Sequence, residues 1–220
     1  MSIIDHILNL IAPHDCISCG REGLLLCSLC AGALLDPQPE CYFCRQPTRA
    51  SSTCRDCYAR AQLVQVIVGT LYDGTAKQLV QRFKYGGAQA AAQTIVAALP
   101  TISANGLVVI PVPTASSRVR RRGYDQAALL AKAFARKHDL EYLPCLRRTG
   151  QSHQVGASRS ERLLQLAQAF RVVHASRLRG KRVLLVDDVI TTGATFEAAA
   201  RVLHAAGAVQ VSALAFARGL

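Results

Sequence analysis

The sequence predicts an α/β domain built on a parallel sheet, preceded by a cysteine-rich metal-binding module. Eight of the nine cysteines fall between residues 16 and 57, in four C-x2-C pairs. After residue 60, apolar runs of strand length alternate with amphipathic helical patterns, which is typical of strand–helix–strand units with a parallel sheet. We therefore expect an N-terminal helix and the cysteine module in residues 1–60, and the α/β domain in residues 61–220.

The composition indicates a folded, cationic protein. Half of the 220 residues are hydrophobic, which is enough for a sizeable core, and the formal net charge is +12. Residues 1–60 hold five basic and six acidic side chains, which leaves 21 basic and eight acidic ones, an excess of +13, for residues 61–220. This excess predicts that the second part binds a polyanion or a phosphorylated small molecule.

Residues 3–11 have the spacing of a short amphipathic helix, with one apolar face formed by Ile4, Ile7, Leu8 and Ile11. The segment lacks basic flanks, so a helix packed on its own domain is favoured over a signal peptide or a membrane anchor. No apolar run approaches the roughly 18–20 residues that a membrane span needs. We therefore expect no membrane insertion and a cytoplasmic location.

The four cysteine pairs have the spacing of zinc knuckles. Two residues between cysteines let both sulfurs face one metal ion, and two knuckles complete a closed tetrahedral site, which is structural rather than catalytic. Disulfides are disfavoured in a reducing cytosol, and the usual spacings of iron–sulfur clusters break the strict pairing seen here. We therefore predict two structural Zn²⁺ ions held by eight thiolates, those of Cys16, Cys19, Cys27, Cys30, Cys41, Cys44, Cys54 and Cys57.

The pairing of the knuckles is less constrained. Residues 27–35 and 54–61 both resemble a second knuckle that runs into a short helix. This favours sequential pairing, in which pair 16/19 shares an ion with pair 27/30. An interleaved arrangement, with pair 16/19 beside pair 41/44, stays open. The ninth cysteine, Cys145, stands in an apolar stretch and is interpreted as a small buried residue.

The elements of the second part follow from its apolar periodicity. A β-branched run over 64–72 predicts a strand, and Asp73 caps a helix with Ala76, Leu79, Val80 and Phe83 on one face. A second helix is predicted to run through about Leu99, and further helices are predicted over 125–138, from Ser158 onward and over 195–206. Strands are predicted over 107–112, 182–187 and 209–216. Continuous apolar strands such as 107–112 are typical of sheets buried on both faces.

Three loops, after Val112, Leu146 and Val186, meet at the carboxyl ends of the strands, where parallel sheets bind ligands. The last loop begins with two acids and continues as a small turn that opens a helix. Such a helix start suits a phosphate, and two adjacent acids suit a vicinal diol or a metal ion. A ribose 5-phosphate satisfies both halves; the alternative is a capped helix with solvated acids. The predicted contacts are Asp187, Asp188, Thr191, Thr192, Gly193, Ala194 and Thr195.

Residues 183–195 resemble the signature of type I phosphoribosyltransferases, which bind phosphoribosyl diphosphate (PRPP) with Mg²⁺. The cysteine pairs, with Tyr72-Asp-Gly, Phe83-Lys-Tyr-Gly-Gly, Pro111-Val-Pro and Arg122-Gly-Tyr-Asp-Gln, are similar over nearly the whole chain to the ComF family of bacterial competence-associated proteins. The resemblance implies a type I phosphoribosyltransferase-like sheet with a double zinc ribbon. It also implies a role in DNA uptake during natural transformation, near single-stranded DNA and with a helicase partner.

The resemblance implies roles for further residues. Pyrophosphate would bind at Pro113 and Thr114, and the Arg-rich stretch 118–124 would close over it as a flap with Gly123 as a hinge. The candidate catalytic residues, which would neutralise charge on departing pyrophosphate, are Arg120, Arg121 and Arg122. Lys84 and Arg162 are further candidate cations. The chain departs from the family at Asp125 and Gln165, where Asn is common, although Asp125 would still cap its helix.

Three functions follow as hypotheses. The leading one is a PRPP- and Mg²⁺-binding phosphoribosyltransferase-like protein whose acceptor is unidentified. The second is a non-enzymatic module that binds single-stranded DNA or a protein partner, which four arginines within residues 118–122 also support. The third is a regulator that senses PRPP or nucleotides.

Overall fold

The computed structural model describes residues 14–86, 88–102, 106–149 and 169–219 of the chain. The expected N-terminal helix and the helix expected from Ser158 lie outside the described residues, as do Arg162 and Gln165. Within the described part, none of the helices combines the length and the apolar character that a membrane crossing requires.

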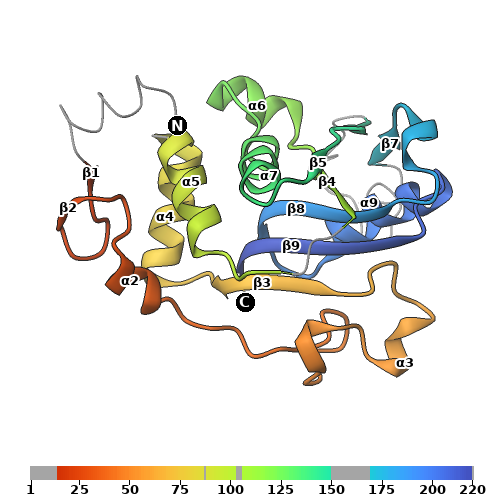
Figure 1. The fold of residues 1–220 in the computed structure, drawn as a ribbon, viewed down its shortest axis with the longest axis horizontal. Helices are drawn as coiled ribbons and strands as arrows, with labels where there is room; N and C mark the ends of the chain where they lie inside the picture. The colour runs from red at the N-terminus through yellow and green to blue at the C-terminus, as the bar shows by residue number, and fades with distance from the viewer. Residues whose placement is uncertain (1–13, 87, 103–105, 150–168, 220) are drawn as a thin grey trace, which may run out of the picture.

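A parallel sheet forms the centre of the fold (Figure 1). Its four neighbouring strand pairs are all parallel, which confirms the predicted α/β architecture. Every residue of β4 is buried, as expected for a strand covered on both faces. The strand order is β3 (Val66–Leu71), β9 (Gln210–Arg218), β8 (Arg182–Ile190), β4 (Leu107–Pro111) and β5 (Glu141–Tyr142).

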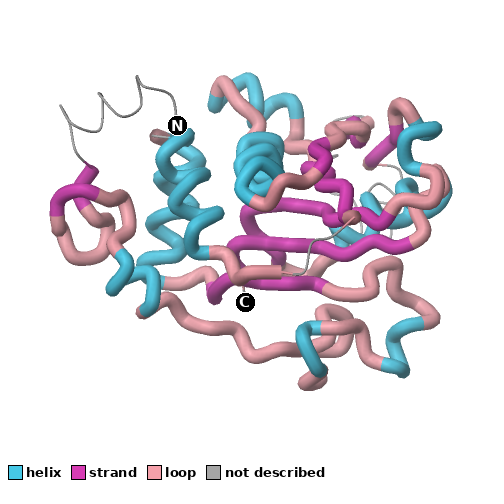
Figure 2. The backbone as a smooth tube through the Cα atoms, in the orientation of Figure 1, coloured by secondary structure: helices cyan, strands magenta, loops and turns pink. Residues whose placement is uncertain are grey.

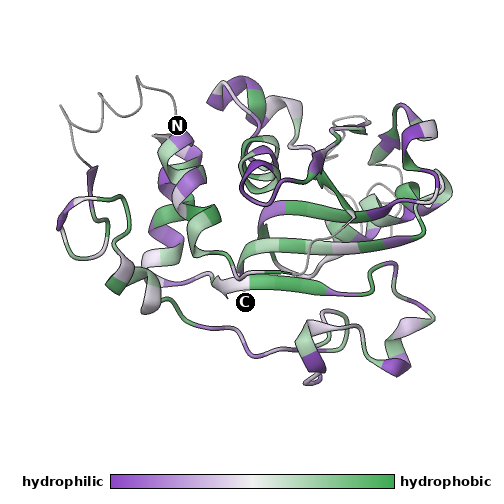
Figure 3. Ribbon diagram, viewed as in Figure 1, coloured by the Kyte–Doolittle hydropathy of each residue, from purple (hydrophilic) through white to green (hydrophobic). Residues whose placement is uncertain are grey.

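Helices cover both faces of this sheet. One face is covered by α4 (Gly74–Tyr85), α5 (Ala88–Ala98) and α7 (Gln126–Lys137), which Figure 2 shows in cyan on one side of the magenta strands. The four side chains predicted to form the apolar face of α4 are all buried. The other face is covered by α9 (Ala194–Ala205), whose Phe196 joins a cluster with strand residues. The central strands between these layers are mainly hydrophobic (Figure 3).

The cysteine-rich segment contributes to both hydrophobic clusters. Leu25 and Leu26 join the cluster of α4, α5 and α7, whereas Tyr42 joins the cluster that contains α9. The segment thus lies on both sides of the edge strand β3, and the boundary at residue 60 stays a prediction. Its short elements are β1 (His14–Asp15), β2 (Glu22–Gly23), α2 (Ser28–Gly32), η1 (Arg49–Ser51) and α3 (Arg55–Tyr58).

Two elements differ from the sequence expectation. Strand β8 continues beyond Asp187 to Ile190, because its last residues pair with the end of β9. The Arg-rich stretch, expected as a flap loop, forms helix α6 (Ser116–Arg122), since arginine is a good helix former. Gly123, with a φ of 81°, ends this helix in the left-handed conformation. The remaining elements are β6 (Leu146–Arg148), β7 (Phe170–Val172) and η2 (Ala175–Leu178).

Candidate functional site

Two carboxylates lie at the carboxyl end of the sheet, where β8 passes the end of β4. Pro111, the last residue of β4, pairs with Val186, and Asp187 and Asp188 follow directly. The backbone amide of Asp188 donates a hydrogen bond of 2.8 Å to Oδ1 of Asp187. Burial, together with the neighbouring Asp188 charge, raises the pKa of Asp187 well above its usual range. The acid pair is thus placed at the predicted edge, and its contact with a ligand stays a prediction.

Lys84 reaches the same edge from α4. Its Nζ lies 3.1 Å from Oδ2 of Asp188, and both side chains are largely buried, with 22% and 13% of their surface exposed. The two groups form an ion pair, but the angles at Nζ and Oδ2 are not those of a hydrogen bond. The structure therefore brings Lys84 to the acid pair, where it is paired with an acid of this chain. Its contact with a ligand stays a prediction.

The turn after β8 is open to solvent at its tip. Thr191 and Thr192 are exposed, whereas Gly193 is buried and has a φ of +79°. This left-handed conformation favours glycine at that position. Helix α9 begins at Ala194 and is 12 residues long, so its first amides have no acceptor within the helix and its dipole favours an anion there. Residues 191–195 thus form an open turn at a helix start, which we call the phosphate turn after the ligand that the sequence predicts for it. Phosphate binding at this turn stays a prediction.

A cleft of about 290 Å³ lies at the carboxyl end of β4, and neither acid of the pair is among the residues that line it. The loop that follows β4 meets β6 in this cleft. The loop expected after Leu146 is instead strand β6, which pairs with β7 outside the parallel sheet. Burial and the positive charge of Arg118 lower the pKa of Arg148 in this cleft, while the Asp187 carboxylate acts in the opposite direction. The cleft is lined by Pro111, Pro113, Thr114, Ser116, Asp125, Ala128, Pro144, Leu146, Arg147 and Arg148.

Asp125 joins two walls of this cleft. Its carboxylate caps α7 by accepting a hydrogen bond of 3.2 Å from the backbone amide of Ala128, which confirms the predicted cap. It also accepts hydrogen bonds from the Thr114 amide at 3.1 Å and the Thr114 hydroxyl at 3.0 Å. The cleft wall therefore carries a carboxylate, so an anion that enters needs nearby cations, and Arg147 and Arg148 lie in the same cleft.

The arginines of α6 lie beside the end of α4. The Arg122 guanidinium is 5.4 Å from the centre of the Tyr85 ring, and the Tyr124 hydroxyl donates to the carbonyl of Phe83. These contacts hold α6 against the helix that carries Lys84. Arg120 and Arg121 are exposed. The catalytic role expected of the three arginines stays a prediction.

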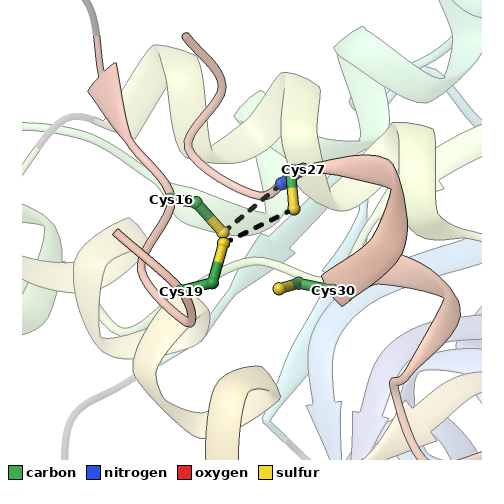
Figure 4. A group of neighbouring side chains, drawn as sticks. All are labelled: Cys16, Cys19, Cys27 and Cys30. Carbon is green, nitrogen blue, oxygen red and sulfur yellow. Dashed lines mark hydrogen bonds between the residues drawn. The ribbon is translucent and has the colours of Figure 1, made fainter. Parts of the chain in front are cut away.

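The cysteines form two groups of four, each able to hold a metal ion. In each group the four Sγ atoms lie within 4.8 Å of one another, and Figure 4 shows the first group. The Sγ atoms of Cys19 and Cys27 are 3.8 Å apart, close to the roughly 3.8 Å edge of a tetrahedron with Zn–S bonds of about 2.3 Å. Residues 16, 19, 27 and 30 form one group and residues 41, 44, 54 and 57 the other. This confirms the sequential pairing that the spacing favoured.

Backbone amides favour thiolates in the first group. The amide of Cys27 is 3.5 Å from the Cys16 sulfur. Hydrogen bonds from the amides of Cys27 and Cys19 lower the pKa of the Cys16 thiol to about 6. Since the thiolate is the form that binds metal, these amides support the metal-binding interpretation of the group.

Known proteins resemble this chain along most of its length. Residues 119–219 match the family described as Phosphoribosyl transferase domain. Competence protein F of Haemophilus influenzae is 36% identical over 113 residues, which are 50% of this chain and 49% of that protein. Competence protein ComFC of Bacillus subtilis is 28% identical over 178 residues, 74% of this chain and 70% of the relative. DNA utilization protein YhgH of Escherichia coli O6:H1 is 27% identical over 219 residues, 93% and 94% of the two chains.

These matches support a ComF-family phosphoribosyltransferase-like protein. Its parallel sheet is the type I phosphoribosyltransferase fold, and the two four-cysteine groups that precede the sheet fit a double zinc ribbon. The match to the Haemophilus relative spans about half of that protein, at 49% of its length.

Sequence reasoning missed two features of this site. Tyr42 and Arg45, from the second cysteine group, contact the phosphate turn. Their hydrogen-bond partners lie 155 and 146 positions later in the chain. A local sequence pattern carries no signal for a contact at that separation. The contact between Asp125 and Thr114 was also missed, because the N-cap pattern predicts only the bond to the helix.

Proposed function

We propose that this ComF-family protein binds PRPP, or a related phosphorylated ribose, together with Mg²⁺ at the carboxyl edge of its sheet. The observation that carries the proposal is the succession of the acid pair and the phosphate turn along one segment. Asp187 and Asp188 lie near the carboxyl end of β8, which ends at Ile190, and the open turn over 191–195 then leads into α9. The phosphate would bind the amides and hydroxyls of the turn, and the sugar hydroxyls would donate to the carboxylates.

The pyrophosphate would enter the adjacent cleft. Pro113 and Thr114 line it, and Arg147 and Arg148 supply positive charge. In a transfer reaction, the acceptor forms a bond to C1 of the ribose while the C1–O bond breaks and its electron pair leaves with pyrophosphate. Bound Mg²⁺ would supply charge for the leaving group. The arginines at 120–122 would neutralise the remainder as α6 moves toward the cleft.

The proposal is tested by isothermal titration of the zinc-loaded chain with PRPP and Mg²⁺. The double variant Asp187→Asn/Asp188→Asn removes both charges at constant size, and we expect PRPP to bind at least tenfold more weakly. Asp139→Asn is the matched control, because Asp139 is exposed and lies between α7 and β5, outside the residues that line the cleft. Wild-type protein that takes up no PRPP would refute the proposal.

We further propose that each four-cysteine group holds one structural Zn²⁺ ion and that the protein is cytoplasmic, where free thiols persist. We also propose that the metal-binding module ends near residue 60. Metal analysis of the purified chain should give two zinc per protein. One zinc, or iron with visible absorbance, would contradict the assignment.

Single-stranded DNA is a second candidate ligand, favoured by the cationic surface of α6. Arg118, Arg120 and Arg121 are exposed on this helix. The relatives are called competence and DNA utilization proteins, which connects the family with DNA uptake in natural transformation. Anisotropy of a labelled oligonucleotide should show salt-dependent binding that Arg118→Gln/Arg120→Gln/Arg121→Gln weakens and Asp187→Asn/Asp188→Asn does not. Equal binding by all these variants would refute this function.

A further inference from the structure

The second cysteine group lies directly against the phosphate turn. Tyr42 stands between the metal-ligand candidates Cys41 and Cys44, and only 3% of its surface is exposed. A Cβ atom added at Gly193 would lie 3.1 Å from Cδ2 and 3.6 Å from Cε2 of the Tyr42 ring. The ring therefore forms the wall behind the buried glycine of the turn.

The Tyr42 side chain also reaches the first turn of α9. Its hydroxyl donates to Oε1 of Glu197, and the backbone amide of Gln62 donates to the same oxygen at 2.9 Å. Glu197 lies one turn after Gly193, and its own amide donates to the Gly193 carbonyl at 2.9 Å. The ring and the hydroxyl of one tyrosine thus fix both the turn and the helix that follows it.

Arg45 makes a second connection. Its Nη2 donates a hydrogen bond of 3.2 Å to the carbonyl of Thr191, and its Nη1 lies 2.5 Å from Oε1 of Glu40. Glu40 also pairs with Arg218 at the end of β9, whose side chain is only 6% exposed. The backbone amide of Arg45 donates to the Cys41 carbonyl at 2.8 Å, so the position of this arginine depends on the fold of the cysteine knuckle.

The first cysteine group has a different environment. Its Cys16 and Cys27 pack in the cluster of α4, α5 and α7, on the other side of the sheet from Tyr42. Among the described residues, no hydrogen bond or ion pair joins this group to residues 191–197. The two groups thus provide an internal comparison, since they share one ligand set and only the second contacts the turn.

We propose that the second cysteine group is a positioning element for the phosphate turn, with Tyr42 and Arg45 as positioning residues, so that metal in this group and phosphate on the turn strengthen each other's binding. The inference rests on the proposed function at this site. A metal bound by Cys41, Cys44, Cys54 and Cys57 fixes the short loop that holds both residues. Because coupling between two ligands is reciprocal, PRPP also makes the metal of the second group harder to remove.

The first experiment uses single substitutions in the zinc-loaded full chain. Tyr42→Phe keeps the ring and removes the hydroxyl, and Arg45→Gln removes the charge. The matched controls are Tyr58→Phe and Arg49→Gln, at exposed positions of the same cysteine segment. We expect the first two variants to weaken PRPP binding about three- to tenfold, as loss of one hydrogen bond implies, while zinc content stays at the wild-type value and both controls bind as wild type.

The second experiment compares the two metal groups. Cys44 and Cys19 are both exposed, one in each group, so Cys44→Ser and Cys19→Ser are equivalent chemical changes. We expect Cys44→Ser to weaken PRPP binding and to speed amide hydrogen exchange over residues 191–197, whereas Cys19→Ser loses metal without either effect. Chelator titration should show PRPP slowing the release of one zinc of two.

The outcomes separate this inference from the proposed function. If wild-type protein binds PRPP and Tyr42→Phe, Arg45→Gln and Cys44→Ser bind it equally well, the inference is wrong. If wild-type protein does not bind PRPP, the proposed function fails, and hydrogen exchange decides the positioning role by itself. Faster exchange of residues 191–197 in Tyr42→Phe and Arg45→Gln, but not in their controls, then supports the role, and unchanged exchange overturns it.

Discussion

Replacement of Gly193 by alanine tests the packing of Tyr42 against the phosphate turn. Two costs are expected. A φ of +79° places an L-residue in the left-handed region, which costs roughly 1–2 kcal/mol. The added Cβ would also lie 3.1 Å from Cδ2 of Tyr42, closer than ordinary van der Waals contact. The ring cannot move away freely, because its hydroxyl is bonded to Glu197 and only 3% of the residue is exposed.

Gly180 provides the control for the backbone cost. Its φ is +70°, and an added Cβ there meets nothing within 4 Å. Gly180→Ala should therefore lower the free energy of unfolding by roughly 1–2 kcal/mol through strain alone. Gly193→Ala should lower it by about 1 kcal/mol more, the smaller end of the cost of overpacking a buried site.

The assay is urea denaturation of wild type and both variants, with PRPP titration on each. PRPP affinity should fall for Gly193→Ala and stay unchanged for Gly180→Ala. Tyr42→Leu in the Gly193→Ala background should restore part of the stability, since a smaller side chain gives the methyl group room. Equal losses for the two glycine variants would refute the argument that the tyrosine ring crowds the turn.

Three further predictions concern the acids and the metal. The pKa of Asp187 is raised in the folded state, so its contribution to stability is greatest at low pH and is lost as pH rises from the ordinary aspartate range through the raised value. Urea denaturation from pH 4 to 8 should therefore show the free energy of unfolding of wild type falling below that of Asp187→Asn as pH rises. Asp125→Ala removes a helix cap and both Thr114 contacts, so it should lower the free energy of unfolding by about 1–2 kcal/mol in the same assay, more than Asp125→Asn does. Equal effects of the two substitutions would contradict the role given to the oxygen acceptors. Removal of metal from the protein by a chelator should lower its melting temperature in calorimetry, and added Zn²⁺ should restore it. An unchanged melting temperature after zinc loss would count against a structural metal.

Local sequence patterns predicted the elements whose cause is local. The buried face of α4 follows from helical periodicity, and the cap at Asp125 follows from the residue type at a helix start. The sequential cysteine groups follow from two repeats of a knuckle and a short helix. The acid pair and the phosphate turn lie at the predicted edge, because they occur within one continuous segment.

Features that depend on partners far along the chain could not be predicted in this way. The extension of β8 to Ile190 depends on pairing with Arg218 in another strand. The ion pair of Lys84 with Asp188 depends on how α4 crosses the sheet. The contact of Tyr42 with Gly193 joins two parts of the chain that carry separate motifs, and neither motif contains a signal for the other.

The placement of the cysteine segment on both sides of β3 has a consequence for any shortened form of the protein. Leu25 and Leu26 cover one side, Tyr42 covers the other, and the carbonyl of Leu35 accepts hydrogen bonds from Thr70 and Leu71 at the end of the strand. A polypeptide that started at Val66 would bare apolar surface above and below and leave an unpaired strand edge. Such a fragment should aggregate, so the phosphoribosyltransferase fold of this chain needs the cysteine segment to remain in solution.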